Sequence, residues 1–169
     1  TDLFLNMQYR VTEKGLERFA ATEQVLDGFT HMGNRYPARH EPWESVESMA
    51  IWLWKRGIKD VFAFDVGVVA TDRGTRYIPI ECNPRFNGAT YPTGIAEEFE
   101  IPGWTAVQLN TRWRSLADLD LSGIEFNPRI KKGIILVNWG PILAGKIGVL
   151  IAGNPTEQDI LRIELERRL

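Results

Sequence analysis

The sequence predicts an α+β domain in which helices cover a mainly antiparallel β-sheet. Apolar residues recur at every second position near the N-terminus and again between residues 60 and 83, which is typical of half-buried strands. From Val46 they recur instead at i, i+3, i+4 and i+7, which is typical of a helix. A chain of 169 residues, 44% of them hydrophobic, is long enough to bury the core of one globular domain.

The N-terminal third predicts a hairpin, a loop and a helix in that order. Alternation supports a strand over residues 3–11, and the turn TEKG leads to a second strand at about 16–26. The polar stretch HMGNRYPARHEP, residues 31–42, is expected to be a loop. The helix that follows is expected to end with Lys55 and Arg56 in its last turn, and Gly57 is placed to close it.

The rest of the chain contains some elements of clear type and one region whose type the sequence does not decide. We expect a strand pair at 60–83, a helix at 92–100, a tryptophan-bearing region of uncertain type at 103–121, an irregular connection around GIEFNPR, strands at 133–138 and 145–152, and a last helix. In the last helix, Thr156 and Asp159 have the spacing of a capping box, so the helix is expected to begin at Thr156.

Composition argues against several classes of partner. A formal charge of −2, from 20 basic and 22 acidic residues, gives no overall field that attracts nucleic acid or a membrane surface. No apolar stretch approaches the roughly 18 to 20 residues of a membrane span. A single cysteine, Cys82, cannot form an internal disulfide and favours a reducing, cytoplasmic setting. The chain begins with Thr1 in what already resembles a strand, so we expect a fragment of a longer chain.

The strand pair at 60–83 can be aligned from its turn. Asp72-Arg73-Gly74 reads as a three-residue hairpin loop with glycine in the left-handed position, which centres the hairpin on Arg73. This register places Asp65 directly opposite Glu81, with Asn83 on the same face. It also predicts that Ile80 and Cys82 point to the opposite, apolar face.

Two carboxylates in facing positions need a compensating charge, because their Cβ atoms are only about 4.5 to 5.5 Å apart and like charges there are destabilising. A hard cation such as Mg²⁺, which prefers oxygen ligands, would supply that charge. A surface salt bridge from Arg10, Arg76 or another basic residue would also supply it. The spacing leaves both interpretations open.

The segment Phe62-Ala63-Phe64-Asp65, followed by a hairpin and then Glu81-Cys82-Asn83-Pro84-Arg85-Phe86-Asn87-Gly88, resembles the metal and phosphate segment of the ATP-grasp superfamily. The resemblance implies that Asp65, Glu81 and Asn83 hold Mg²⁺ or Mn²⁺ between ATP phosphates. It implies that Arg85 contacts phosphate or an acyl-phosphate intermediate. ATEQVLDGFTHMGNRYP and GPILAGKIGVLIAGNP also resemble flanking segments of that family.

The same resemblance suggests a C-terminal ATP-grasp portion covering residues 1–169, because nothing in the chain resembles the earlier part with its phosphate-binding lysine and glycine-rich loop. It implies an ATP- and Mg-dependent ligase that activates a carboxylate as an acyl phosphate and joins it to an amine or similar nucleophile. The fragment alone is expected to be inactive without the N-terminal remainder of its chain, and a homo-oligomer is possible. The alternative is a nucleotide- and metal-binding regulatory module without ligase activity.

Four further residues are candidates for substrate binding. Asn87, Gly88 and Tyr91 follow the arginine and are placed to border the acceptor substrate, although a turn and a helix start would explain them equally. Arg35 has the forked guanidinium that grips acidic groups, although a solvated loop arginine is the simpler interpretation.

Overall fold

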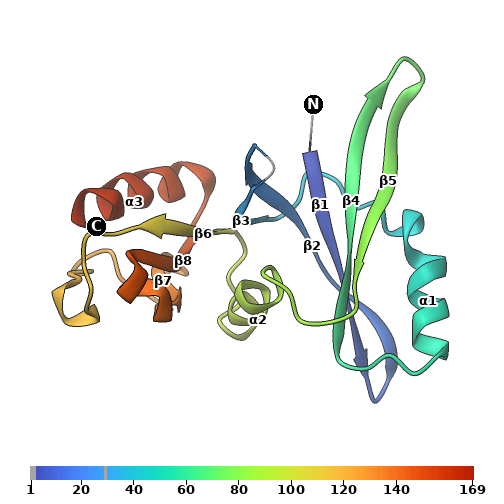
Figure 1. The fold of residues 1–169 in the computed structure, drawn as a ribbon, viewed down its shortest axis with the longest axis horizontal. Coiled ribbons are helices and arrows are strands. Elements are labelled where there is room, and N and C mark those ends of the chain that lie inside the picture. The colour runs from blue at the N-terminus through green and yellow to red at the C-terminus, as the bar shows by residue number, and fades with distance from the viewer. Residues whose placement is uncertain (1–2, 29) are drawn as a thin grey trace. The chain divides into compact units, whose positions relative to one another are not determined.

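The structure is a computed structural model that describes residues 3–28 and 30–169 (Figure 1). The strands are β1 (Leu3–Thr12), β2 (Gly15–Asp27), β3 (Thr30–Tyr36), β4 (Val61–Thr71), β5 (Gly74–Asn83), β6 (Trp104–Asn110), β7 (Gly133–Asn138) and β8 (Lys146–Ala152). The α-helices are α1 (Glu47–Lys55), α2 (Thr90–Glu98) and α3 (Pro155–Arg168), and short 3-10 turns lie at Trp43–Ser45, Leu116–Asp118 and Gly140–Ala144. Within the described ranges, no helix has the length and apolar character needed to span a membrane.

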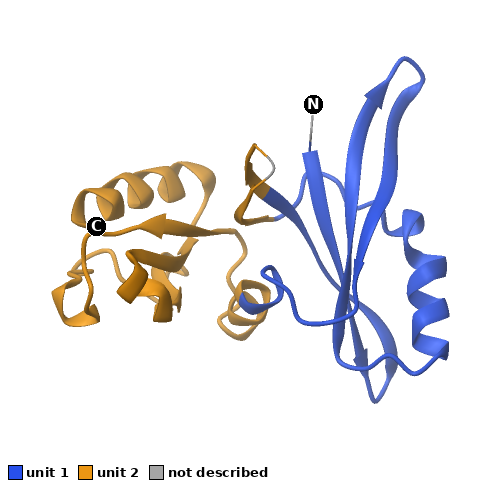
Figure 2. Ribbon diagram, viewed as in Figure 1, with its two compact units in different colours: residues 1–24, 37–91 blue, residues 25–36, 92–169 orange. Residues whose placement is uncertain are grey.

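The eight strands form one sheet in the order β5-β4-β1-β2-β3-β6-β8-β7, and the strand pairs with a described register are antiparallel. This confirms the predicted α+β class. The chain divides into two compact units, residues 1–24 with 37–91 and residues 25–36 with 92–169 (Figure 2). We refer to them as unit 1 and unit 2.

Unit 1 buries one face of β1 and β4 against α1. The strands contribute alternate residues, and the helix and its preceding turn contribute apolar residues at helical spacing. The buried set is Leu5, Met7, Tyr9, Ala21, Trp43, Val46, Ala50, Phe62, Phe64, Val66 and Val68. Because successive strand residues point to opposite faces, this core forces Asn6 and Asp65 onto the other face of the sheet.

Unit 2 has its own core under α3. Leu161 and Leu165 of the helix pack with Val107, Ile147 and Val149 of β6 and β8. The helix starts earlier than predicted: Asn154 is the N-cap, its side chain accepts from the Glu157 backbone N–H at 3.0 Å, and the Glu157 carboxylate accepts from the Asn154 N–H. The expected Thr156 and Asp159 capping box is therefore wrong, because Asn154 with Pro155 at the first helical position forms a complete box closer to the N-terminus.

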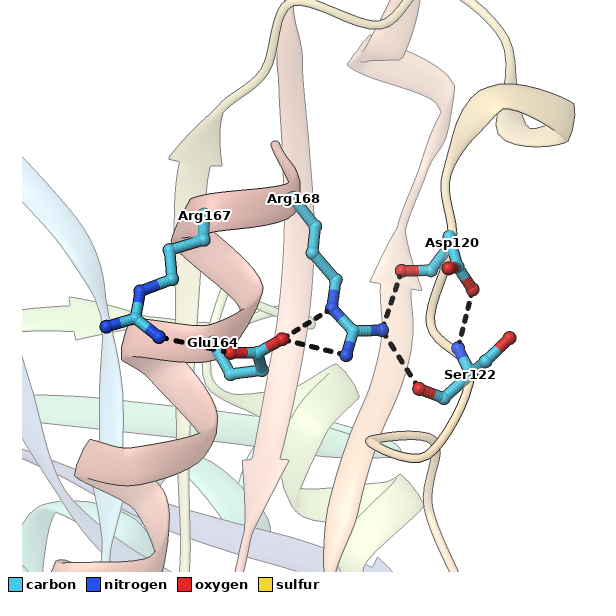
Figure 3. A network of polar contacts seen from close by, with 5 residues as sticks. All are labelled: Asp120, Ser122, Glu164, Arg167 and Arg168. Atoms are coloured by element: carbon cyan, nitrogen blue, oxygen red, sulfur yellow. Dashed lines mark hydrogen bonds and ion pairs between the residues drawn. The ribbon is translucent and has the colours of Figure 1, made fainter.

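The last turn of α3 is fastened to the loop after the Leu116–Asp118 turn. Arg168 Nε and Nη2 donate to the Glu164 carboxylate at 3.0 and 2.8 Å, and Arg168 Nη1 donates to the backbone carbonyls of Asp120 and Ser122 (Figure 3). Arg167 reaches Glu164 only at 3.5 Å. A single guanidinium thus connects the helix to a segment 46 to 48 residues away in sequence.

Two predicted boundaries need correction. Residues 31–36, expected to be part of a loop, belong to β3, which pairs with β6 from Gly33 opposite Val107 to Tyr36 opposite Trp104. The unassigned region at 103–121 contains β6 itself at 104–110. The helices near 46–56 and 92–100 and the strands at 133–138 and 145–152 are confirmed, with ends that differ by at most two residues.

The β4–β5 hairpin differs from the predicted register near its tip. Thr71 pairs with Gly74, so the turn contains only Asp72 and Arg73. The pairing continues in this register to Val66 and Pro79, and a bulge at Ile80 then shifts it by one residue. Beyond the bulge, the predicted register is correct.

Candidate functional site

Asp65 and Glu81 are cross-strand partners on β4 and β5, as the sequence predicted. Asn83 lies on the same face, because its Nδ2 donates to Asp65 Oδ2 at 3.2 Å. Asn83 is buried, with 8% of its surface exposed, whereas Asp65 is partly buried and Glu81 is exposed. The three side chains therefore form a cluster in which the Asn83 amide is buried and the Glu81 carboxylate faces solvent.

Asn6 of β1 is a fourth member of this cluster that the sequence analysis did not single out. It pairs with Asp65 across β1 and β4, and its Nδ2 donates to Asp65 Oδ1 at 2.7 Å. Asn6 is only 4% exposed. The sequence did carry a signal for Asn6, which is a polar residue between Leu5 and Met7 in an alternating strand. Its partner Asp65 could not be identified from the sequence, because that contact depends on the non-local pairing of β1 with β4.

Glu81 makes no hydrogen bond or ion pair with residues 3–28 or 30–169. A salt bridge from Arg10 or Arg76, the alternative interpretation of the acid pair, is not formed at this residue in the described part of the chain. Arg10 instead lies 3.6 Å from Glu17. The Glu81 carboxylate is thus available to a ligand.

The oxygen atoms of the cluster fit a hard cation. The described residues contain no group of three or more His, Cys, Asp and Glu side chains that could hold a metal. Two carboxylates with a neighbouring amide nevertheless match the few protein ligands with which Mg²⁺ binds when waters and phosphate oxygens complete its coordination. Asp65 is oriented by amides on both sides, and Glu81 is unengaged, so the pair can take a cation without breaking an ion pair at Glu81.

The bulge turns Ile80 toward this cluster and corrects the prediction that it faces the core. Gly67, two residues from Asp65 on the same face, has Ile80 Cδ1 only 3.0 Å from the position that a Cβ atom would occupy. Ile80 is 59% exposed, and Ile78 and Val69 are exposed to 40% and 42%. We call Val69, Ile78 and Ile80 the apolar strip. It lies along β4 and β5 beside the acids.

Cys82 is not the small core residue that the sequence predicted, because it is exposed at the edge strand. Partial desolvation, together with the charge of Glu81, raises the pKa of its thiol. A thiol with a raised pKa is less often present as the thiolate that binds metals and attacks electrophiles. Cys82 is therefore a poor candidate for a ligand or nucleophile.

The candidates after the cluster lie on the turn into α2 and in the first turn of that helix. Arg85 is exposed, and its Nη1 donates to the carbonyl of Phe86 at 3.1 Å. Asn87 Oδ1 accepts from the backbone N–H groups of Ala89 and Thr90 at 2.9 and 3.3 Å, so it caps the start of α2. Gly88 and Tyr91 are exposed, and the Tyr91 ring lies 6.1 Å from that of Phe86.

Arg35 lies on β3 in unit 2, where it is exposed and pairs through its backbone with Thr105. It is not among the side chains that come together on β1, β4 and β5 of unit 1. Its neighbour in sequence Arg39 has a structural partner, since its backbone N–H and its Nε both donate to the buried Glu23 at 2.7 Å. The strand position of Arg35 was missed because HMGNR shows no clear alternation.

Comparison of the fold identifies similar solved structures. N5-carboxyaminoimidazole ribonucleotide synthetase from Thermus thermophilus matches with a TM-score of 0.60 and 12% identity over 98% of this chain and 50% of its own. The phosphoribosylaminoimidazole carboxylase ATPase subunit from Aquifex aeolicus matches with 0.57 and 14% over 95% and 54%. N5-carboxyaminoimidazole synthase from Aspergillus clavatus, in complex with ADP and 5-aminoimidazole ribonucleotide, matches with 0.54 and 10% over 98% and 51%.

These matches cover nearly the whole chain at low identity, so they show a shared fold. The chain spans about half the length of each of these three solved chains. No family model and no curated protein matches the sequence.

Proposed function

The chain has the fold of about half of an ATP-grasp enzyme, and from this premise we propose that it is part of an ATP- and Mg-dependent ligase. In this proposal it is the C-terminal ATP-grasp portion of a longer chain and activates a carboxylate as an acyl phosphate. An amine or similar nucleophile then displaces the phosphate. The observation that carries the proposal is the facing pair Asp65 and Glu81, with Asn83 hydrogen-bonded to Asp65.

The cluster has the chemistry that phosphoryl transfer requires. Asp65, Glu81 and Asn83 would hold Mg²⁺, which supplies positive charge to the oxygens of the transferring phosphoryl group. Asp65 is kept in place by two amide donors, so little reorganisation is needed when phosphate arrives. Arg85 is exposed two residues after Asn83 and can offer a planar fork of donors to phosphate oxygens.

The apolar strip suggests where the base of the nucleotide would lie. Val69, Ile78 and Ile80 present exposed apolar surface beside a cluster suited to phosphates. A purine ring needs apolar surface to cover its faces, and Ile80 of the strip packs over Gly67, two residues from Asp65. Nucleotide binding with phosphates toward Asp65 and base toward Ile80 would cover both surfaces at once.

The comparisons support an amine as the acceptor. The Aspergillus enzyme is in complex with ADP and 5-aminoimidazole ribonucleotide, a molecule with an amino group. Gly88, on the turn after Arg85, and Tyr91, at the start of α2, are exposed, and we propose that they border the acceptor. Asn87 would contribute through the turn that it caps.

A second candidate function is a nucleotide- and metal-binding regulatory module without ligase activity. It would use the same Asp65, Glu81 and Asn83 cluster to hold a metal ion and nucleotide phosphates without a transfer step. The two candidates predict the same metal and nucleotide binding but differ in turnover by the longer chain. ATP-dependent phosphate release across candidate acids and amines separates them, because only a ligase couples release to both substrates.

The metal site is tested by thermal unfolding of the 169-residue chain with and without Mg²⁺. We expect Mg²⁺ to raise the Tm of the wild type and to raise that of Glu81→Gln much less, since the amide cannot replace the charge. Without metal, Glu81→Gln should be as stable as the wild type or slightly more stable, because the repulsion with Asp65 is removed. Glu13→Gln, an exposed glutamate in the β1–β2 turn, is the matched control and should respond like the wild type.

In the longer chain, Glu81→Gln should lower phosphate release steeply, and Arg85→Lys should impair it because an ammonium cannot form the planar fork. Undiminished turnover by Glu81→Gln would overturn the proposed site. Substrate-dependent turnover of about 1 s⁻¹ or more by residues 1–169 alone would contradict their proposed role as part of a longer enzyme.

A further inference from the structure

Asn6 occupies a central position on the polar face of unit 1. It lies on β1, between β4 and β2, and it is directly opposite Asp65 of β4 and Thr22 of β2. At 4% exposure it is as buried as core residues, yet its side chain is an amide. A buried amide is stable only when its donors and acceptor find partners.

The two ends of this amide differ. Nδ2 donates to Asp65 Oδ1 at 2.7 Å, a short hydrogen bond between an amide and a carboxylate. Oδ1 is buried and has no hydrogen-bond partner among the described residues. An acceptor buried without a donor is destabilising, so a water molecule or a cation that reached Oδ1 would stabilise this arrangement.

The other polar side chains of the cluster do not account for the orientation of the Asn6 amide. The second carboxylate, Glu81, lies on β5 opposite Asp65 and forms no hydrogen bond with Asn6 among the described residues. Asn83 holds the other oxygen of Asp65. Asp65 is therefore held by two amides from two different strands. Of these two amides, only that of Asn6 has a buried oxygen atom without a hydrogen-bond partner among the described residues.

From this arrangement we infer that Asn6 is a positioning residue of the cation cluster: it holds Asp65 through Nδ2 and offers Oδ1 as a further oxygen to a bound divalent cation or to water on it. This inference rests on the proposed function, since it assigns Asn6 to the same cation site. An amide is suited to both tasks at once, because it donates to the carboxylate from one end and presents an uncharged oxygen from the other.

The test is Mn²⁺ binding to the 169-residue chain, measured by the electron paramagnetic resonance of the free ion. Asn6→Leu keeps a similar volume but removes both the donor and the oxygen, and we expect its Mn²⁺ affinity to fall about tenfold. Asn6→Asp keeps the shape and adds a charged oxygen. We expect it to lower the metal-free Tm, through repulsion with Asp65, and to bind Mn²⁺ at least as tightly as the wild type.

Asn34→Leu is the matched control, because Asn34 is an asparagine of β3 that is 1% exposed and belongs to unit 2. It should leave Mn²⁺ affinity unchanged even if it lowers stability. A purely structural role for Asn6 predicts that Asn6→Leu and Asn6→Asp both lower the Tm and both bind Mn²⁺ like the wild type.

Coupling to Asp65 gives a second measurement that is independent of any loss of stability. In an Asp65→Asn background, Asn6→Leu should change Mn²⁺ affinity by less than about twofold, because the carboxylate through which Asn6 acts is gone. If the wild type binds Mn²⁺ and Asn6→Leu binds it with the same affinity, the inference is overturned and the proposed site remains intact. A wild-type chain that binds no Mn²⁺ would overturn the proposed function and the inference together.

Discussion

Ile80 lies against Gly67, on the face of the β4–β5 hairpin that carries Asp65, and its Cδ1 would be 3.0 Å from a Cβ atom on that glycine. A one-residue bulge at Ile80 produces this contact. Because of the bulge, the consecutive residues Ile80 and Glu81 both lie on the face of Asp65, and Ile80 does not point into the core. An apolar surface and an acid pair are thus adjacent on one hairpin.

Replacement of Ile80 by serine should weaken nucleotide binding and leave the fold intact. The side chain is 59% exposed, so its loss should change the free energy of unfolding by no more than about 0.5 kcal/mol. Loss of its apolar surface from a base-binding strip should lower affinity for ADP with Mg²⁺ by roughly five- to thirtyfold, as expected for about 1 to 2 kcal/mol of burial. NMR shift titration measures this even for millimolar binding.

Ile160→Ser, at a 63% exposed position of α3, is the control for the removal of a surface isoleucine. It should not change ADP affinity. Equal ADP affinity in the wild type and Ile80→Ser would contradict the assignment of the apolar strip to the base.

Gly33→Ala should disrupt the pairing of β3 with β6. A Cβ atom there would lie 1.8 Å from the carbonyl oxygen of Ala106, and a backbone atom cannot move aside as a side chain can. We expect a loss of more than about 3 kcal/mol in the free energy of unfolding, measured by urea denaturation.

The matched variant is Gly94→Ala, the same chemical change within α2, where a Cβ atom would meet nothing within 4 Å. It should raise stability by about 0.5 to 1 kcal/mol, because alanine restricts the unfolded chain and favours the helix. A similar destabilisation in both variants would show that the close approach at Gly33 is not the cause.

The two arginines at the end of α3 should differ in their contribution to stability. Arg168 donates to Glu164 through two nitrogens and to two backbone carbonyls through the third, whereas Arg167 makes one contact at 3.5 Å. Arg168→Lys should therefore lower the Tm by several degrees, and Arg167→Lys should have an effect near zero. Equal Tm values for the two variants in differential scanning calorimetry would contradict the connection drawn in Figure 3.

The helix cap at Glu157 should make stability depend on pH in the acid range. The backbone N–H of Asn154, and then Lys132, lower the pKa of Glu157 below its ordinary value of 4.5. A lowered folded-state pKa means that the stabilisation is complete above pH 4.5 and is lost as pH falls through the folded value.

Glu157→Gln preserves the cap geometry but cannot titrate. The difference in Tm between the wild type and Glu157→Gln should therefore be largest near neutral pH and shrink below about pH 4.5. A difference that stays constant from about pH 7 to about pH 3 would exclude a contribution from the charge of Glu157.

The acid pair could be predicted from sequence because two local deviations cancel. The turn is one residue tighter than the glycine position suggested, which shifts the register by one, and the bulge at Ile80 shifts it back before Glu81 is reached. The bulge itself has no signature in the string IPIEC, so the predicted orientation of Ile80 was wrong, whereas Cys82 pairs with Phe64 as predicted but is exposed. A shift of one residue reverses the face of a strand residue, which is why Ile80 was assigned to the wrong face.

Other features depended on partners that are remote in sequence. The polar residues of β3 adopt a strand because β6, far along the chain, supplies a hydrogen-bonding edge. Asn6 was recognisable as polar within an alternating strand, but its contact with Asp65 joins residues 59 apart. Local patterns identify elements and the faces of regular strands, whereas the neighbour of each strand is decided by packing of the whole sheet.

The pairing of β1 with β4 has a consequence for the order of folding. β1 with β2 and β4 with β5 are hairpins that close over short loops, and such local contacts form early. The Asn6–Asp65 hydrogen bond spans 59 residues and forms only when the two hairpins dock. We therefore expect the acid pair to form early, on the β4–β5 hairpin, and the Asn6–Asp65 hydrogen bond to form late. Substitutions at Asn6 should then accelerate unfolding and leave the folding rate nearly unchanged.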